Sequence, residues 1–123
     1  MEAEEYRRLY ECERSYWWYR GLRLTVVGML KRLGIGREHR VLDAGCGTGR
    51  LLREIQHELA PGSLGFDVSP HAARYWTQEG LGQVCLGSLN QIPFANATFD
   101  AVVCVDVLEC DGVRVVNLAD ELD

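Results

Sequence analysis

The residues best suited to chemistry are an aspartate and three alternating glycines that follow an apolar run: Asp43, Gly45, Gly47 and Gly49. Glycine has no Cβ, so the backbone can pass close to a ligand at these positions. A buried strand that ends in an acidic residue and continues into a glycine-rich turn and a helix is typical of a pocket for a nucleotide-like cofactor. The stretch 41–49 therefore predicts such a pocket.

The spacing of the glycines narrows the kind of cofactor. A dinucleotide-binding turn has the pattern G-x-G-x-x-G, which would place its third glycine at position 50 if Gly45 were the first. That position holds Arg50. An NAD-dependent oxidoreductase is therefore the less favoured alternative.

The elements that must position this turn alternate along the chain. Apolar residues at helical spacing predict helices, and short apolar runs predict buried strands. We expect helices over 4–19, from after Gly21 to before Gly34, over 49–59, over 69–79 and from about 111, and strands over 40–44, 63–68, 83–86 and 100–105. This order predicts an α/β fold, a Rossmann-like doubly wound parallel sheet preceded by N-terminal helices.

The stretch 41–49 resembles motif I of the class I S-adenosylmethionine-dependent methyltransferases. Two later stretches are similar to the same family: 86–94, which contains Ile92-Pro93-Phe94, and 105–110, which follows the fourth strand. The resemblance implies a strand order of 3-2-1-4, S-adenosylmethionine as the cofactor, and transfer of its methyl group to an acceptor that the sequence does not identify. It also divides the chain into an N-terminal helical lid or cap (1–36) and a methyltransferase domain (37–123).

Two strand-end carboxylates are the main candidate ligands of the cofactor. Asp67 ends the second strand, where a carboxylate can accept hydrogen bonds from both ribose hydroxyls; the alternative is a capping carboxylate for the helix over 69–79. Asp43 would face the cofactor's ammonium group, or else only shape the turn. Ser88 stands where the family usually has an aspartate that contacts the adenine amino group. The predicted cofactor-binding residues are Asp43, Ala44, Gly45, Cys46, Gly47, Gly49, Asp67, Val68, Ser88, Leu89, Asp106 and Val107.

A catalytic base is needed only for acceptors that must lose a proton. Asp106 and Glu109 are the candidates by position alone, and a capping or surface role for Asp106 is equally open. We expect no metal site, because the five cysteines lack ligand spacing and indicate reduced thiols: Cys12, Cys46, Cys85, Cys104 and Cys110.

The N-terminal segment 16–21 is aromatic and resembles a segment of some small-molecule methyltransferases. It would form a lid over the cofactor, with Arg20 or Arg23 near a carboxylate. The favoured alternative is an aromatic face that packs a helix onto the sheet.

The chain ends at Asp123, inside the expected last helix, and the later strands of the family do not appear in the sequence. We therefore expect a partial domain, truncated after strand four, with methyl transfer by this chain alone in doubt. A non-catalytic binding or interaction module is the alternative. Strand four would form an exposed apolar edge, open to self-association or to a partner protein.

The composition excludes several other classes. A net charge of −5 argues against a nucleic-acid-binding surface. No apolar run reaches the roughly 18 residues that span a membrane, and the acidic start carries no secretory signal. We therefore expect a cytoplasmic protein with neither a nucleic-acid nor a membrane partner.

Overall fold

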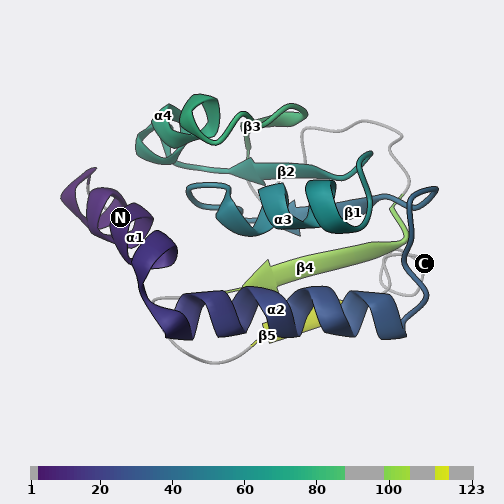
Figure 1. Ribbon diagram of the computed structural model, residues 1–123. Helices are drawn as coiled ribbons and strands as arrows, with labels where there is room; N and C mark the ends of the chain where they lie inside the picture. Colours follow the sequence, from purple (N-terminus) through teal and green to yellow (C-terminus); the bar gives the residue numbers. More distant parts are fainter. Residues whose placement is uncertain (1–2, 88–98, 106–112, 117–123) are drawn as a thin grey trace.

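The computed structural model describes residues 3–87, 99–105 and 113–116. Its elements are α1 (Ala3–Ser15), α2 (Trp17–Arg32), β1 (Val41–Ala44), α3 (Arg50–Glu58), β2 (Leu64–Asp67), α4 (Pro70–Gln78), β3 (Val84–Leu86), β4 (Ala101–Val105) and β5 (Val113–Val116) (Figure 1). Strands and helices alternate through the first three strands, as expected for an α/β fold.

The strands form one sheet in the order β3-β2-β1-β4-β5. Pairing is parallel from β3 through β4, with Leu42 opposite Leu64 on one side of β1 and Asp43 opposite Val103 on the other. The predicted Rossmann-like fold and its order 3-2-1-4 are therefore confirmed. Because β1 is central, the carboxyl ends of β1, β2 and β4 lie along one edge of the sheet.

Side chains of the central strands alternate between two apolar clusters. Val41 and Val103 pack with Leu30 of α2 and Ile55 of α3. Leu42 and the other alternate positions point to the opposite face, in a cluster with Ala44, Leu64, Phe66 and Phe99. Burial on both faces explains why these strands are continuously apolar in sequence.

Two expectations about strand four were wrong. Residues 113–116 form a strand rather than part of a helix, and that strand pairs with β4 in antiparallel fashion, with Val105 opposite Val113. Consequently β4 is not an edge of the sheet. Pairing satisfies backbone groups that an edge strand would leave exposed, and β-branched residues such as Val115 and Val116 favour a strand.

The boundary between the first two helices was also misplaced. Tyr16 is extended (φ −89°, ψ 132°) and separates α1 from α2, whereas Gly21 lies within α2. The separation lets α1 pack against α4 while α2 packs against α3 (Figure 1). Tertiary packing, rather than the helix-weakening glycine, decides where the chain turns.

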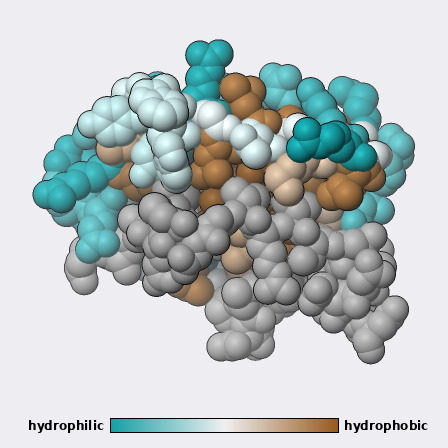
Figure 2. Space-filling view, turned by 90° about the horizontal axis from the view of Figure 1, so that it is seen from below, coloured by the Kyte–Doolittle hydropathy of each residue, from teal (hydrophilic) through white to brown (hydrophobic). Residues whose placement is uncertain are grey.

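The aromatic residues at this turn do not pack onto the sheet, contrary to the favoured alternative. Tyr16 is 59% exposed, Trp17 81% and Trp18 42%. Leu24 and Leu33 are also exposed. Figure 2 views the molecule from below, and in the coloured part of that face apolar residues lie between hydrophilic residues at its left, upper and right edges.

No helix in the described part of the chain has both the length and the apolar character needed to cross a membrane.

Candidate cofactor site

The glycine turn between β1 and α3 has the backbone conformation that its sequence predicts. Gly45, Gly47 and Gly49 all have positive φ, at 74°, 58° and 93°. An added Cβ would meet nothing within 4 Å at Gly45 or Gly47, whereas on Gly49 it would clash with Leu81. The first two glycines therefore leave open space beside the backbone, and the third allows α3 to pack closely against the segment after α4.

Hydrogen bonds from β2 and α4 hold this turn in place. The amides of Gly45 and Cys46 donate to the carbonyl of Phe66, at 2.9 and 2.8 Å. The indole nitrogen of Trp76 donates to the carbonyl of Gly47 at 2.9 Å. The turn is thus fixed by neighbouring elements as well as by its glycines.

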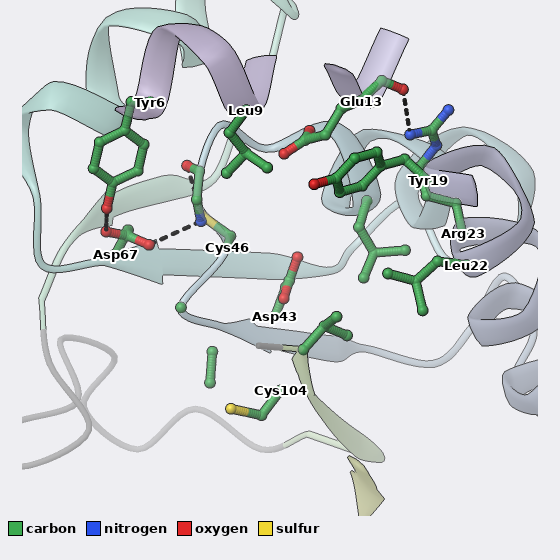
Figure 3. A pocket seen from close by; sticks show the side chains of 15 residues that line it. Tyr6, Leu9, Glu13, Tyr19, Leu22, Arg23, Asp43, Cys46, Asp67 and Cys104 are labelled. Atoms are coloured by element: carbon green, nitrogen blue, oxygen red, sulfur yellow. Dashed lines mark hydrogen bonds between the residues drawn. The ribbon is translucent and has the colours of Figure 1, made fainter. Parts of the chain in front are cut away.

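Asp67, at the end of β2, is buried and accepts three hydrogen bonds. Its Oδ2 accepts from the amide of Gly47 at 2.8 Å, and its Oδ1 accepts from the amide of Ser69 at 3.0 Å and from the hydroxyl of Tyr6 at 3.2 Å (Figure 3). Asp67 therefore bonds to the residue that precedes α4 and does not itself cap the helix. Ser69 is the N-cap residue of α4, since its side chain accepts from the amide of His71.

Asp43, at the end of β1, is in a different state. It is 2% exposed, and its Oδ2 has no hydrogen-bond partner among the described residues. Burial raises the pKa of this carboxyl to about 7, and the negative charges of Asp67 and Glu13 add to the effect. A buried carboxylate without partners is costly, so this site favours a cationic or hydrogen-bond-donating ligand.

Glu13 of α1 is the third acidic group of this pocket, beside Asp43 and Asp67. Its carboxylate accepts a hydrogen bond from the Thr48 hydroxyl at 2.8 Å. Burial raises the pKa of Glu13 to about 7, although the Thr48 hydrogen bond and the charge of Arg23 act in the opposite direction. Arg23 in turn donates to the backbone carbonyl of Glu13 at 2.7 Å, which ties α2 to α1.

These groups surround a cavity of about 290 Å³. Figure 3 shows Asp43 between the α1 side chains Leu9 and Glu13 on one side and Cys104 of β4 on the other. Tyr19 and Arg23 of α2 complete the wall opposite the glycine turn. The two N-terminal helices therefore form part of the pocket wall.

Most predicted site residues in the described part of the chain meet at this cavity: Asp43, Ala44, Gly45, Cys46, Gly47 and Asp67 line it. Gly49 does not line the cavity; its lack of a Cβ lets the start of α3 pack closely against Leu81. Val68 does not line the cavity, and its side chain is 66% exposed beyond the end of β2. Ser88, Leu89, Asp106, Val107 and Glu109 lie outside the described residues.

Sequence reasoning missed three residues that shape the site. These are Tyr6 and Glu13 of α1 and Trp76 of α4, none of which belongs to a motif. Their contacts join segments that are far apart in sequence, so no local pattern would have found them. Of the two arginines expected near a carboxylate in the lid interpretation, Arg20 and Arg23, Arg23 lines the cavity.

The described residues support neither an NAD-dependent oxidoreductase nor a metal site. Arg50, at the third glycine position of a dinucleotide turn, pairs with Glu79 at 3.2 Å instead. Within residues 3–87, 99–105 and 113–116, no group of three metal-binding side chains comes together. The four described cysteines form no disulfide, and burial raises the pKa of the Cys46 thiol, which keeps it protonated.

The family model described as a methyltransferase domain matches residues 41–121. The chain therefore belongs to that family, and the predicted resemblance is confirmed.

Solved structures share the fold of this chain. CalS10 from Micromonospora echinaspora, an amino pentose methyltransferase with S-adenosylmethionine bound, is 25% identical with a TM-score of 0.62, over 82% of this chain and 41% of that one. DesVI from Streptomyces venezuelae is 18% identical with a TM-score of 0.65, over 86% and 44%. A methyltransferase from Thiobacillus denitrificans in complex with S-adenosylhomocysteine is 21% identical with a TM-score of 0.51, over 69% and 36%.

The family and these cofactor-bound structures support S-adenosylmethionine as the cofactor, as predicted. The chain spans less than half the length of these three solved proteins.

The residues present fit this cofactor. Its methionine part carries an ammonium group, which suits the unpartnered Oδ2 of buried Asp43. The open side of Gly45 and Gly47 leaves room for a ligand against the backbone.

Proposed function

We propose that this chain binds S-adenosylmethionine in the cavity between the glycine turn and the N-terminal helices, as the cofactor half of a methyltransferase. The observation that carries the proposal is the buried, unpartnered carboxylate oxygen of Asp43 beside three positive-φ glycines. In this proposal Asp43 faces the ammonium group, the backbone at Gly45 and Gly47 faces the methionine part, and Asp67 binds the ribose. Val68, exposed at the end of β2, would cover the adenine where it extends beyond the cavity.

The helices α1 and α2 would act as the cap that excludes water from the cofactor. Tyr6, Leu9 and Glu13 supply one wall from α1, and Tyr19 and Arg23 supply another from α2. Arg23 is the described basic residue best placed to meet the cofactor's carboxylate. Holding the cofactor in one orientation contributes to rate because aligned reactants have a high effective molarity.

Methyl transfer is the reaction that such a site would serve. The bound cofactor would supply an activated methyl group on its sulfonium, and the chain's residues would hold and orient it. We propose transfer to an acceptor that the pocket does not identify, with Asp106 or Glu109 as the base where the acceptor must lose a proton. A partner protein remains part of this proposal. It would not pair with β4, because β4 already pairs with β5 and is not an edge of the sheet.

Calorimetric titration with S-adenosylhomocysteine tests the proposal. The wild-type chain should bind with a Kd on the order of micromolar, and Asp67→Ala should weaken binding by at least about tenfold, since a hydrogen bond to a charged group contributes roughly 1.5–3 kcal/mol. Asp100→Ala is the matched control, because this exposed aspartate precedes β4 at the opposite edge of the sheet. A folded wild-type chain that does not bind would refute the proposal.

Radiolabelled methyl transfer then separates an enzyme from the non-catalytic alternative. Binding without transfer to any acceptor in a panel of amines, hydroxyls and thiols would favour a binding module.

A further inference from the structure

The hydroxyl of Tyr6 occupies part of the surface on which the ribose would bind. It lies 3.2 Å from Oδ1 of Asp67, and both residues line the cavity (Figure 3). The two residues are 61 positions apart in sequence, so this contact exists only because α1 folds over the end of β2.

Asp67 has little hydrogen-bonding capacity left. A carboxylate offers about four lone-pair positions. The amides of Gly47 and Ser69 and the hydroxyl of Tyr6 take three of them. A ribose presents two hydroxyl donors, so the remaining position holds only one of them.

Of the three present donors, Tyr6 is the one that can be released. The amides of Gly47 and Ser69 belong to the glycine turn and to the start of α4, so breaking those bonds would disturb the backbone of the site. The Tyr6 bond is the longest of the three and comes from a side chain.

We propose that Tyr6 is an affinity-determining residue of the cofactor site: its hydroxyl stands in for one ribose hydroxyl on Asp67 and must leave when the cofactor binds. The proposal rests on the proposed cofactor binding at this cavity. At one of the two ribose hydroxyls, binding then exchanges one hydrogen bond for another instead of adding a new one. The cap helix α1 and the cofactor compete for the same carboxylate.

Titration of Tyr6→Phe with S-adenosylhomocysteine tests this competition. The substitution removes the hydroxyl and keeps the ring. We expect Tyr6→Phe to bind roughly tenfold more tightly than wild type, because the hydrogen bond to charged Asp67 no longer has to be broken. Tyr10→Phe is the matched control: Tyr10 lies on the same helix and in the same buried cluster, but its hydroxyl bonds to Arg14. Its affinity should equal that of wild type.

An analogue of S-adenosylhomocysteine without the 2′ and 3′ hydroxyls gives a second, independent readout. The gain in Tyr6→Phe should disappear with this analogue, since nothing then competes for Asp67. The wild-type chain alone should lose less than about a hundredfold on removal of the ribose hydroxyls, because one of them replaces the bond from Tyr6 and only the other adds a hydrogen bond. The loss of affinity in the wild-type chain can be measured even if Tyr6→Phe does not fold.

The outcomes separate the two proposals. Equal or weaker binding by folded Tyr6→Phe, or a wild-type loss of a hundredfold or more with the analogue, would overturn the role of Tyr6 while leaving cofactor binding intact. Absence of any binding by folded wild-type and Tyr6→Phe chains would overturn the proposed function, and the role of Tyr6 with it.

Discussion

The neighbouring ends of β1 and β2 both carry a buried aspartate, yet the two side chains are in opposite states. Asp67 accepts three hydrogen bonds and ties the glycine turn, α1 and α4 together. Asp43 leaves one buried oxygen without a partner among the described residues, and burial raises its pKa to about 7. The same residue type at the same edge of the sheet is thus well supplied with hydrogen-bond donors in one strand and short of them in the other.

The difference follows from what folds over each strand end. The end of β2 lies beneath Tyr6 of α1 and leads directly into α4, so donors converge on Asp67 (Figure 3). Around Asp43 the neighbouring polar groups include two further carboxyls, Asp67 and Glu13. A cluster of acids without enough donors is unfavourable in the unliganded protein, and this is the usual signature of a functional site.

The largest expected effect comes from disrupting the glycine turn, which follows Asp43 and donates the Gly47 amide to Asp67. Gly49→Ala should lower the free energy of unfolding by about 3 kcal/mol or more, because a Cβ there clashes with Leu81 and the backbone has a φ of 93°. Urea denaturation measures the change. Gly21→Ala, in a helix with nothing within 4 Å of the added carbon, should be neutral or stabilising by about 0.5–1 kcal/mol. A Gly49→Ala chain as stable as wild type would show that the turn does not require this geometry.

The structural role of Asp67 should appear in stability without any ligand. Asp67→Asn removes the negative charge that accepts from two amides and a phenol, so we expect a loss of about 2–3 kcal/mol in the free energy of unfolding. Asp100→Asn, which affects one exposed bond to the amide of Arg40, should lose less than about 1 kcal/mol. If Asp67→Asn were as stable as Asp100→Asn, the structural role assigned to Asp67, in contrast to Asp43, would be wrong.

Asp43 should behave in the opposite way. Its pKa in the folded chain is about 7, above the value of about 4 for an unfolded aspartate, so between these pH values the folded state binds more protons. The contribution of Asp43 to stability therefore falls as pH rises from about 4 to about 7 and is constant above that. Asp43→Asn removes this cost and should raise the free energy of unfolding at pH 8 by on the order of 2 kcal/mol, while weakening binding of S-adenosylhomocysteine.

Denaturation of wild type and Asp43→Asn across pH 4–8 checks this prediction. The two stability curves should converge toward pH 4 and separate toward pH 8. The wild-type slope should not vanish entirely in the variant, since the pKa of Glu13 is also raised to about 7. Parallel curves, or a variant that is less stable at pH 8, would contradict the state assigned to Asp43.

Much of this site follows from local sequence. Asp43 and the glycines at 45, 47 and 49 define the turn, because positive φ is favourable only for glycine and the strand before it is apolar. Ser69 followed by Pro70 defines the start of α4, through a side-chain cap and a residue that suits the first helical position. The alternation of elements also predicted the parallel sheet, and the resemblance to the methyltransferase family implied its order 3-2-1-4.

Only the tertiary structure decided which groups complete the site. Tyr6 on Asp67 and Glu13 on Thr48 are contacts between residues 61 and 35 positions apart, and no periodicity encodes them. The break at Tyr16 and the strand at 113–116 depend on what each segment packs or pairs with, which outweighs local propensity. The contrast between Asp43 and Asp67 has the same origin, because burial and the supply of donors at a strand end are properties of the folded chain.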